Sequence, residues 1–366
     1  MTQADRLGQG GDRLPDPGIP VLGPIRPTPD HERTGMGSGL KQQVESLAAT
    51  MAPTPLVPLA DERLDLFAKL EFSNFSGSAK DRSALWILRQ AILREQITEK
   101  SALVESSSGN FAIALASFCA SLGLGFIPVI DPNVNRTTEN FLRAISTRVE
   151  KVTDLDDTGG YLKSRLNRVH ELRDELRDCF WPNQYANMDG ADAHYRFTAA
   201  ELCRSLDRID YAFVGVGTAG TIVGLSRRLK ETHPRLRVIA VDVEGSVIFG
   251  GAPGRRRIPG IGSSIVPPLL EHALIDELVV VPEYESVAGC VRLWRRHGIY
   301  AGGSSGAVYA AIQRYFADYR GPRPRVVFLC ADRGNAYAGT VYNPRWVAEA
   351  YPERIGNLLV TSPVSV

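Results

Sequence analysis

Residues 211–231, YAFVGVGTAGTIVGLSRRLKE, contain the pattern that decides the fold class. The apolar run Tyr211–Val216 predicts a buried strand, and the spacing of apolar residues in Thr221–Glu231 predicts a helix. The glycines between these two runs predict a tight turn. A strand that passes through a short glycine-rich turn into a helix is typical of α/β proteins with parallel sheets.

The same alternation of apolar runs and helical spacing recurs along most of the chain. Further strands are predicted at residues 64–70, 101–105, 125–130, 238–243, 278–281 and 325–329, and further helices at 81–95, 112–122, 138–146, 161–177 and 307–318. We therefore expect an α/β protein with parallel-rich, twisted sheets that are flanked by helices. Residues 1–39 are rich in Gly, Pro, Asp and Arg, which predicts a mobile extension.

Composition narrows the function classes. The 366 residues include 42 basic and 41 acidic side chains, so a formal net charge of +1 gives no reason to expect a nucleic-acid or membrane partner. The five cysteines form no CxxC pair, which fits a reducing compartment, and no secretion signal or membrane-spanning run is evident. We expect a cytoplasmic protein. The six histidines lack metal-ligand spacing, so no metal site is predicted.

A lysine opens one of the predicted helices. The stretch NFSGSAKDR, residues 74–82, follows a strand and places Lys80 in the first helical turn. The positive end of a helix lowers the pKa of an amine, and a lowered pKa suits a lysine that forms a Schiff base. A solvated lysine beside Asp81 explains the same residues equally well.

Three more loops join strands to helices. The loop VGVGTAGT, residues 214–221, suits a phosphate, although a plain turn or a dinucleotide site fits the same glycines. The loop ESSSGN, residues 105–110, suits a carboxylate, or its serines only cap a helix. The loop AGGSSGA, residues 301–307, would turn Ser304 or Ser305 toward a ligand, or each serine only caps the helix that follows. Residues 330–337 end the last predicted strand and would line the same crevice.

The order of these motifs is more specific than any one of them. SGSAKDR, SSGN, GTAGT and GGSSGA, in this order, resemble the fold-type II pyridoxal-phosphate enzymes, the cysteine synthase group, from about Thr54 to Tyr342. The resemblance implies a two-lobed fold like that of the tryptophan synthase β chain, and a homodimer. We expect the larger lobe at residues 40–75 and 186–345, the smaller lobe at 76–185, and a peripheral tail at 346–366.

The resemblance also implies roles for individual residues. Lys80 would be the catalytic Schiff-base lysine that binds pyridoxal 5'-phosphate, Asn110 would bond the ring hydroxyl, and Ser304 would bond the pyridine nitrogen. The loop that would hold the cofactor phosphate consists of Gly217, Thr218, Ala219, Gly220 and Thr221. The loop that would bind the substrate carboxylate consists of Ser107, Ser108 and Gly109.

Within this group, a narrower likeness is visible. FWPNQYAN (180–187), DVEGSVIFG (242–250) and IPGIG (258–262) are similar to the synthases that join O-phospho-L-serine to L-glutamate for 2,3-diaminopropionate and siderophore biosynthesis. A carboxylate of glutamate, the second substrate, would then need a cationic side chain to bind it. Arg165 is the leading candidate, with a surface salt bridge as an equal alternative. Tyr185 would border the second-substrate site, or it would pack with Trp181.

Three other functions remain open on the sequence. A cysteine synthase or O-phosphoserine sulfhydrylase would share the fold and the cofactor. A non-catalytic regulator would share only the fold, and an intact Lys80 speaks against it. A nicotinamide dehydrogenase would use the loop at 214–221 but leaves Lys80 and Ser304 unexplained.

Overall fold

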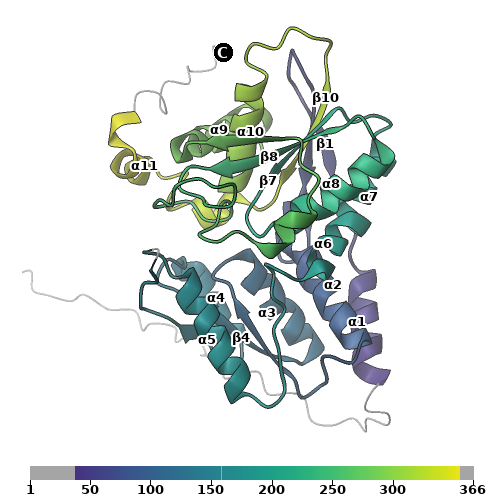
Figure 1. Ribbon diagram of the computed structural model, residues 1–366, viewed down its shortest axis with the longest axis vertical. Coiled ribbons are helices and arrows are strands. Elements are labelled where there is room, and N and C mark those ends of the chain that lie inside the picture. Colours follow the sequence, from purple (N-terminus) through teal and green to yellow (C-terminus); the bar gives the residue numbers. More distant parts are fainter. Residues whose placement is uncertain (1–37, 158, 355–366) are drawn as a thin grey trace, which may run out of the picture. The chain divides into compact units, whose positions relative to one another are not determined.

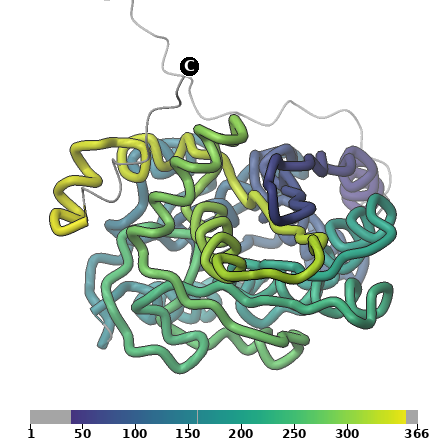
Figure 2. Tube along the Cα trace, turned by 90° about the horizontal axis from the view of Figure 1, so that it is seen from above, coloured from purple at the N-terminus to yellow at the C-terminus, as the bar shows by residue number. Residues whose placement is uncertain are grey.

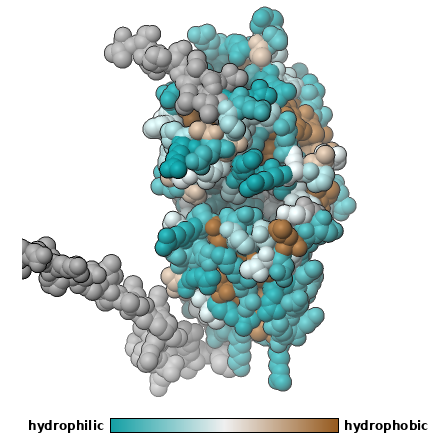
Figure 3. All heavy atoms as spheres, turned by 90° about the vertical axis from the view of Figure 1, so that its left-hand side faces the viewer, coloured by the Kyte–Doolittle hydropathy of each residue, from teal (hydrophilic) through white to brown (hydrophobic). Residues whose placement is uncertain are grey.

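The computed structural model describes residues 38–157 and 159–354, and two sheets form its framework (Figure 1). Nearly all of the predicted extension at residues 1–39, and residues 355–366 of the predicted tail, lie outside the described residues. None of the helices in the described ranges is long and apolar enough to cross a bilayer. The face drawn in Figure 3 is mostly hydrophilic, and its apolar side chains lie in small separate patches.

The larger sheet has six strands in the order β1-β2-β10-β7-β8-β9. Their bounds are β1 Leu56–Leu59, β2 Asp65–Leu70, β7 Tyr211–Gly215, β8 Arg237–Val243, β9 Glu277–Val281 and β10 Arg325–Cys330. Only β1 pairs antiparallel, with β2, while every other neighbouring pair is parallel. The late strand β10 lies between β2 and β7, so early and late parts of the chain run side by side (Figure 2).

Both faces of this sheet are buried, as is usual for a parallel sheet, and successive side chains of a strand point to opposite faces. On β8, Ile239 and Val241 pack toward one cluster of apolar residues, while Val238 and Ala240 pack toward another. The helices on the first face are α9, Glu283–His297, and α10, Gly303–Tyr315. The helices on the other face are α7, Ala200–Ser205, and α8, Gly220–Thr232. This layering brings the start of α8 to the carboxyl end of β7.

The smaller sheet has four parallel strands in the order β5-β4-β3-β6. Their bounds are β3 Ala102–Ser106, β4 Gly125–Ile130, β5 Glu150–Lys151 and β6 Cys179–Phe180. One face is covered by α1 Ser38–Ala49, α2 Lys80–Leu93, α3 Asn110–Leu122 and α4 Arg136–Ile145. The other face is covered by α5, Leu162–Glu175. On β4, Phe126 and Ile127 point to these opposite faces.

The remaining elements connect or flank the sheets. They are α6 Met188–Ala193, a π-helical turn His194–Ala199, α11 Pro344–Ala350, and the 3-10 turns Glu71–Ser73, Pro268–His272, Gly334–Tyr337 and Pro352–Arg354. Leu40 and Val44 of α1 pack beside the smaller sheet, although the predicted boundaries assigned residues 40–75 to the larger lobe. In α11, Val347 is buried against Tyr337 and Val341. The division into lobes stays a prediction.

Candidate active site

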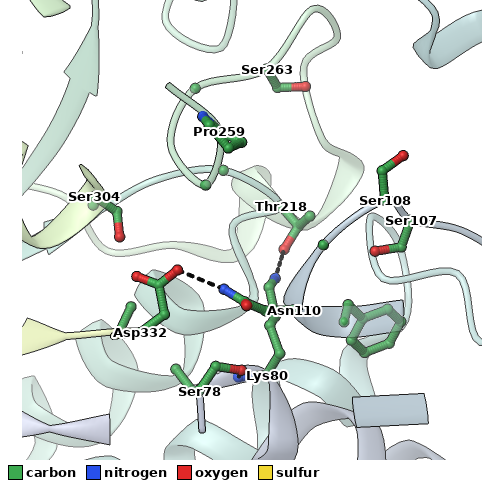
Figure 4. Close-up of a pocket in the computed structure, with 18 of the residues that line it drawn as sticks. Ser78, Lys80, Ser107, Ser108, Asn110, Thr218, Pro259, Ser263, Ser304 and Asp332 are labelled. Carbon is green, nitrogen blue, oxygen red and sulfur yellow. Dashed lines mark hydrogen bonds between the residues drawn. The ribbon is translucent and has the colours of Figure 1, made fainter. Parts of the chain in front are cut away.

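A cavity of about 430 Å³ lies at the carboxyl ends of the parallel strands, where α/β proteins bind ligands. Its size falls within the range of sites for small molecules and cofactors. The loops predicted from the sequence meet here (Figure 4). The predicted site residues that line it are Lys80, Ser107, Ser108, Gly109, Asn110, Arg165, Tyr185, Gly217, Thr218, Ala219, Thr221 and Ser304. Gly220 is buried and is not among the lining residues.

The loop before Lys80 is folded tightly onto the first turn of α2. The Asp81 carboxylate accepts a hydrogen bond from the Ser76 backbone N–H at 2.7 Å and another from the Ser76 hydroxyl. The Ala79 N–H donates to the Ala331 carbonyl at 2.8 Å, which ties the loop to the end of β10. Hydrogen bonds made by its two sequence neighbours, Ala79 and Asp81, therefore position Lys80, and the one made by Ala79 reaches the end of β10.

The Lys80 amine points into the cavity and donates to the Thr218 hydroxyl oxygen at 3.0 Å (Figure 4). Burial lowers the pKa of Lys80 to about 8, against the opposing effect of Glu105. Lys80 is half-buried, and its amine is bonded to Thr218 inside the cavity, which favours the site role over a solvated lysine. The sequence suggests the helix end as the cause of a lowered pKa, whereas burial is the largest cause in the folded chain.

The glycine-rich loop turns sharply into α8. Ala219 has a φ of +67°, a left-handed conformation that is rare for a residue other than glycine. Farther along α8, a Cβ at Gly224 would lie 2.3 Å from the Ala191 carbonyl oxygen, so α8 needs a glycine to pack this closely on α6. The start of α8 is thus held rigidly, with its free backbone N–H groups at the cavity.

The His194 ring lies beside the start of α8 and contacts a hydroxyl group there. Its Nε2 lies 3.3 Å from the Thr221 hydroxyl oxygen and 3.2 Å from that of Ser83. Burial lowers the pKa of His194 to about 3, so the ring is neutral at physiological pH. A neutral, fully packed histidine here has a structural role.

Asn110 and Asp332 form the opposite wall. The Asn110 side-chain amide donates to the Asp332 carboxyl oxygen Oδ2 at 2.8 Å, and the Tyr337 hydroxyl donates to the same oxygen at 2.9 Å. Burial raises the pKa of Asp332, and its Oδ1 has no hydrogen-bond partner among the described residues. The sequence indicated that residues 330–337 line the crevice, but it did not single out Asp332.

The serine-rich loop at residues 105–110 contacts the start of α3 through Ser107 and a pair of charged residues through Ser108. The Ser107 hydroxyl oxygen accepts a hydrogen bond from the Ala112 N–H at 3.2 Å, which is the capping role named as the alternative. The Ser108 hydroxyl donates to Asp131 Oδ2 at 3.2 Å and accepts from an Arg165 NH group at 3.0 Å. Both serines nevertheless line the cavity.

Arg165 is part of the cavity wall and is not a surface residue. Its side chain is 13% exposed, and its Nε lies 3.2 Å from Asp131 Oδ2. The alternative of a surface salt bridge is therefore wrong. Asp131, which the sequence analysis missed, follows β4 directly, and the carboxyl end of a parallel strand is the signal that could have found it. The ion pair neutralises the Arg165 charge.

Tyr185 lines the cavity, and a buried carboxyl group lies behind it. Burial raises the pKa of the Tyr185 hydroxyl. Burial also raises the pKa of Glu105 to about 8, although its Oε1 accepts a 3.4 Å hydrogen bond from the Trp181 indole N–H. Trp181 stacks edge-on with His170, with ring centroids 5.1 Å apart. Glu105 Oε2 has no partner within the described part of the chain.

These features can be compared with those of known proteins. Residues 47–332 match the family described as "Pyridoxal-phosphate dependent enzyme". The chain belongs to this family. Two relatives from bacteria carry the same name, N-(2-amino-2-carboxyethyl)-L-glutamate synthase. One, from Ralstonia nicotianae, is 42% identical over 328 residues, 88% of this chain and 96% of its own. The other, from Cupriavidus metallidurans, is 43% identical over 318 residues, 84% and 93% of the two chains.

Solved structures of this enzyme family share the fold. An O-acetylserine dependent cystathionine beta-synthase from Helicobacter pylori superposes with a TM-score of 0.74 and 27% sequence identity, covering 86% of this chain and all of its own. The expected fold-type II architecture is thereby confirmed, and so are the enzyme class and the pyridoxal-phosphate cofactor.

The residues in the cavity fit this cofactor. An amine with a lowered pKa faces the cavity from Lys80, and a helix start rich in glycine lies 3.0 Å away at the Thr218 hydroxyl. A phosphate binds well at such a helix start because the backbone N–H groups are free. Ser304 reaches the cavity from the first turn of α10 with a hydroxyl that can meet a ring nitrogen. In the described ranges, no group of three or more His, Cys, Asp or Glu side chains could hold a metal ion.

Proposed function

We propose that this enzyme joins O-phospho-L-serine to L-glutamate. The product is N-(2-amino-2-carboxyethyl)-L-glutamate, and inorganic phosphate is released. The shared name of two relatives, each more than 40% identical over most of both chains, carries the proposal. The cavity supports it, because it offers an amine, a phosphate-binding loop and a separate set of polar groups to a substrate.

Four parts of the chain would hold the cofactor. The Lys80 amine would bind its aldehyde, and the loop Gly217–Thr221 would bind its phosphate. Asn110, oriented by Asp332, would donate its second amide hydrogen to the ring hydroxyl. Ser304 would bond the pyridine nitrogen. Once bound, the cofactor supplies an electron-withdrawing ring that stabilises negative charge at the substrate α-carbon.

The Lys80 amine would also carry the proton. As an amine not bonded to the cofactor, the Nζ of Lys80 would remove the α-proton of the substrate and later return it. A pKa of about 8 places this group near neutral pH, which is where a general base works best. The Ser304 hydroxyl is neutral and does not favour a charged ring, which suits elimination at the β-carbon over transamination.

The substrates would bind on the side of the smaller sheet. The backbone and hydroxyls of Ser107, Ser108 and Gly109 would hold the carboxylate of phosphoserine. Arg165 and Tyr185 border the adjoining space and would contact the substrates there. The C–O bond to phosphate breaks at the β-carbon, and the glutamate amine forms the new C–N bond and loses a proton.

A competition experiment tests the proposal. Purified enzyme with phosphoserine and equal concentrations of glutamate and sulfide should yield mainly the glutamate adduct, detected by mass spectrometry. Cysteine as the main product would overturn the proposal in favour of an O-phosphoserine sulfhydrylase. The Lys80→Ala variant is the control, because loss of the amine should remove the yellow colour and lower phosphate release by about a thousandfold or more.

Four further assignments belong with this proposal. We propose that the enzyme is a cytoplasmic homodimer and that its product serves 2,3-diaminopropionate and siderophore biosynthesis. We also propose that the lobes divide at residues 76 and 185, with α1 packed against the smaller lobe. Light scattering tests the dimer, since a purified protein with the mass of one chain would contradict it.

A further inference from the structure

Arg257 is an exposed cation at the edge of the cavity, and the mechanism above does not use it. It lies in the loop between β8 and β9 and belongs to the residues that line the cavity. The charged side chains of the lining are Lys80, Asp131, Arg165, Arg257 and Asp332. Two substrates that carry several anionic groups must be bound among these five residues.

The other two cations are already engaged. The Lys80 amine is reserved for the cofactor, and the Arg165 guanidinium is paired with Asp131 at 3.2 Å. For Arg257, the described part of the chain offers no carboxylate within ion-pair distance of the guanidinium. Because no carboxylate of the described chain competes for its guanidinium, Arg257 is the cation best placed to recognise a second carboxylate.

The backbone of Arg257 is fixed although its side chain is exposed. The N–H groups of Arg257 and Ile258 both donate to Glu283 Oε1, at 2.6 Å each. The Tyr351 hydroxyl donates to the other oxygen of the Glu283 carboxylate at 2.7 Å. The Glu283 carboxylate is thus occupied by backbone and tyrosine, which leaves the guanidinium of Arg257 free for a ligand.

The same tyrosine also restricts the side chain. The guanidinium carbon of Arg257 lies 5.8 Å from the centroid of the Tyr351 ring, within the range of a cation–π contact. Ile258 is buried, and a Cβ at Gly303 would lie 2.2 Å from its Cγ2, so the loop has no room to shift toward α10. The segment after α11 therefore orients a residue of the active site.

We propose that Arg257 is a specificity-determining residue that binds the side-chain carboxylate of the incoming amino acid. The inference rests on the proposed function, because it takes glutamate as the second substrate. A guanidinium presents two parallel N–H groups to a carboxylate, which an amide or a small neutral nucleophile cannot match. Glu283 and Tyr351 act as positioning residues for this contact.

Steady-state kinetics with two second substrates test the proposal. The holoenzyme and its Arg257→Gln variant are compared with glutamate and with glutamine, which lacks the side-chain charge. For the wild type, kcat/KM should be higher for glutamate than for glutamine. In Arg257→Gln this preference should shrink about tenfold to a hundredfold, as expected for a charge-assisted hydrogen bond, while KM for phosphoserine stays the same. Arg257→Lys should restore part of the preference.

Matched controls separate the possible outcomes. Arg255 is also exposed but lies outside the cavity lining, so Arg255→Gln should leave both substrates unaffected. Tyr351→Leu removes the ring and the hydrogen bond to Glu283, and it should raise KM for glutamate without changing the cofactor absorbance. An unchanged glutamate preference in Arg257→Gln would overturn this inference alone. A wild-type enzyme that does not use glutamate would overturn the proposed function instead.

Discussion

The amine of Lys80 lies 3.0 Å from the hydroxyl oxygen of Thr218, although 138 positions separate the two residues in the sequence. Lys80 begins α2, which packs beside the smaller sheet, and Thr218 follows β7 of the larger sheet. The contact therefore joins the two sheets at their carboxyl ends. One cofactor with an aldehyde and a phosphate can bind to both groups at once.

Replacing Thr218 with Val should weaken cofactor binding. The change removes one hydroxyl from the proposed phosphate loop and retains the shape of the side chain. Since a hydrogen bond to a charged group contributes about 1.5–3 kcal/mol, the dissociation constant of pyridoxal phosphate should rise about tenfold or more. Titration of the apoenzyme, followed by visible absorbance, measures it. Thr232→Val, at an exposed helix end, should leave the constant unchanged.

Asp332 should act through Asn110. In Asp332→Ala the Asn110 amide loses the acceptor that orients it, so cofactor affinity should fall about as far as in Asn110→Ala. The double variant should be no worse than either single one, because both changes remove the same contact. Asp332→Asn retains an acceptor oxygen and should lose less affinity. Fully additive losses in the double variant would contradict this coupling.

Glu105 should make the folded enzyme less stable as the pH rises. Burial raises its pKa from 4.5 to about 8, so the folded state retains a proton that the unfolded state releases. Its stabilising contribution is therefore complete below pH 4.5 and is lost as the pH rises through about 8. Each pKa unit corresponds to about 1.4 kcal/mol, so the total loss is on the order of several kcal/mol.

Urea unfolding of Glu105→Gln at pH 5 and pH 8 checks this effect. The variant carries a neutral side chain of the same shape, so its free energy of unfolding should fall less between these two values than that of the wild type. Glu353→Gln, at an exposed position, should behave as the wild type does. Parallel pH dependences for wild type and Glu105→Gln would show that the carboxyl is ionised throughout this range.

Arg82→Met should destabilise the fold strongly. Two residues after Lys80, the Arg82 guanidinium is buried between Glu71, at 2.7 Å, and Glu201, at 2.8 Å. Removing it leaves two buried carboxylates with Lys69 as their remaining cation, at 2.5 Å from Glu201. Loss of one partner from a buried ion pair costs about 3–5 kcal/mol, which thermal or urea unfolding should reveal.

An exposed pair provides the comparison for Arg82. Arg143 forms an ion pair with Glu139 one turn away on α4, with half of its side chain exposed. Arg143→Met should change the free energy of unfolding by less than about 1 kcal/mol, because water screens such pairs. Equal effects of the two substitutions would show that burial does not strengthen the network around Arg82.

Local signals account for the elements that the sequence predicted well. The strand Gly125–Ile130 has the predicted bounds, and α2 begins one residue before its predicted start. Several elements were not predicted, and β1 and α9 show two different reasons. β1 is short, contains Pro58 and pairs only at the sheet edge, so its strand signal is weak. α9 follows β9 after a single residue, and its acidic first turn and basic last turn are a helix signal present in the sequence.

Local patterns in the chain are enough to predict the α/β class, the place of Lys80 at a helix start and the glycine- and serine-rich loops. The reason is that turn chemistry and hydrophobic period act between residues close in the chain. Which charged and polar groups pair with one another depends on the folded structure. It pairs Arg165 with Asp131, joins Asn110 to Asp332 and leaves Arg257 free for a ligand. Ion pairing and burial depend on distances through space, between residues that no sequence periodicity relates.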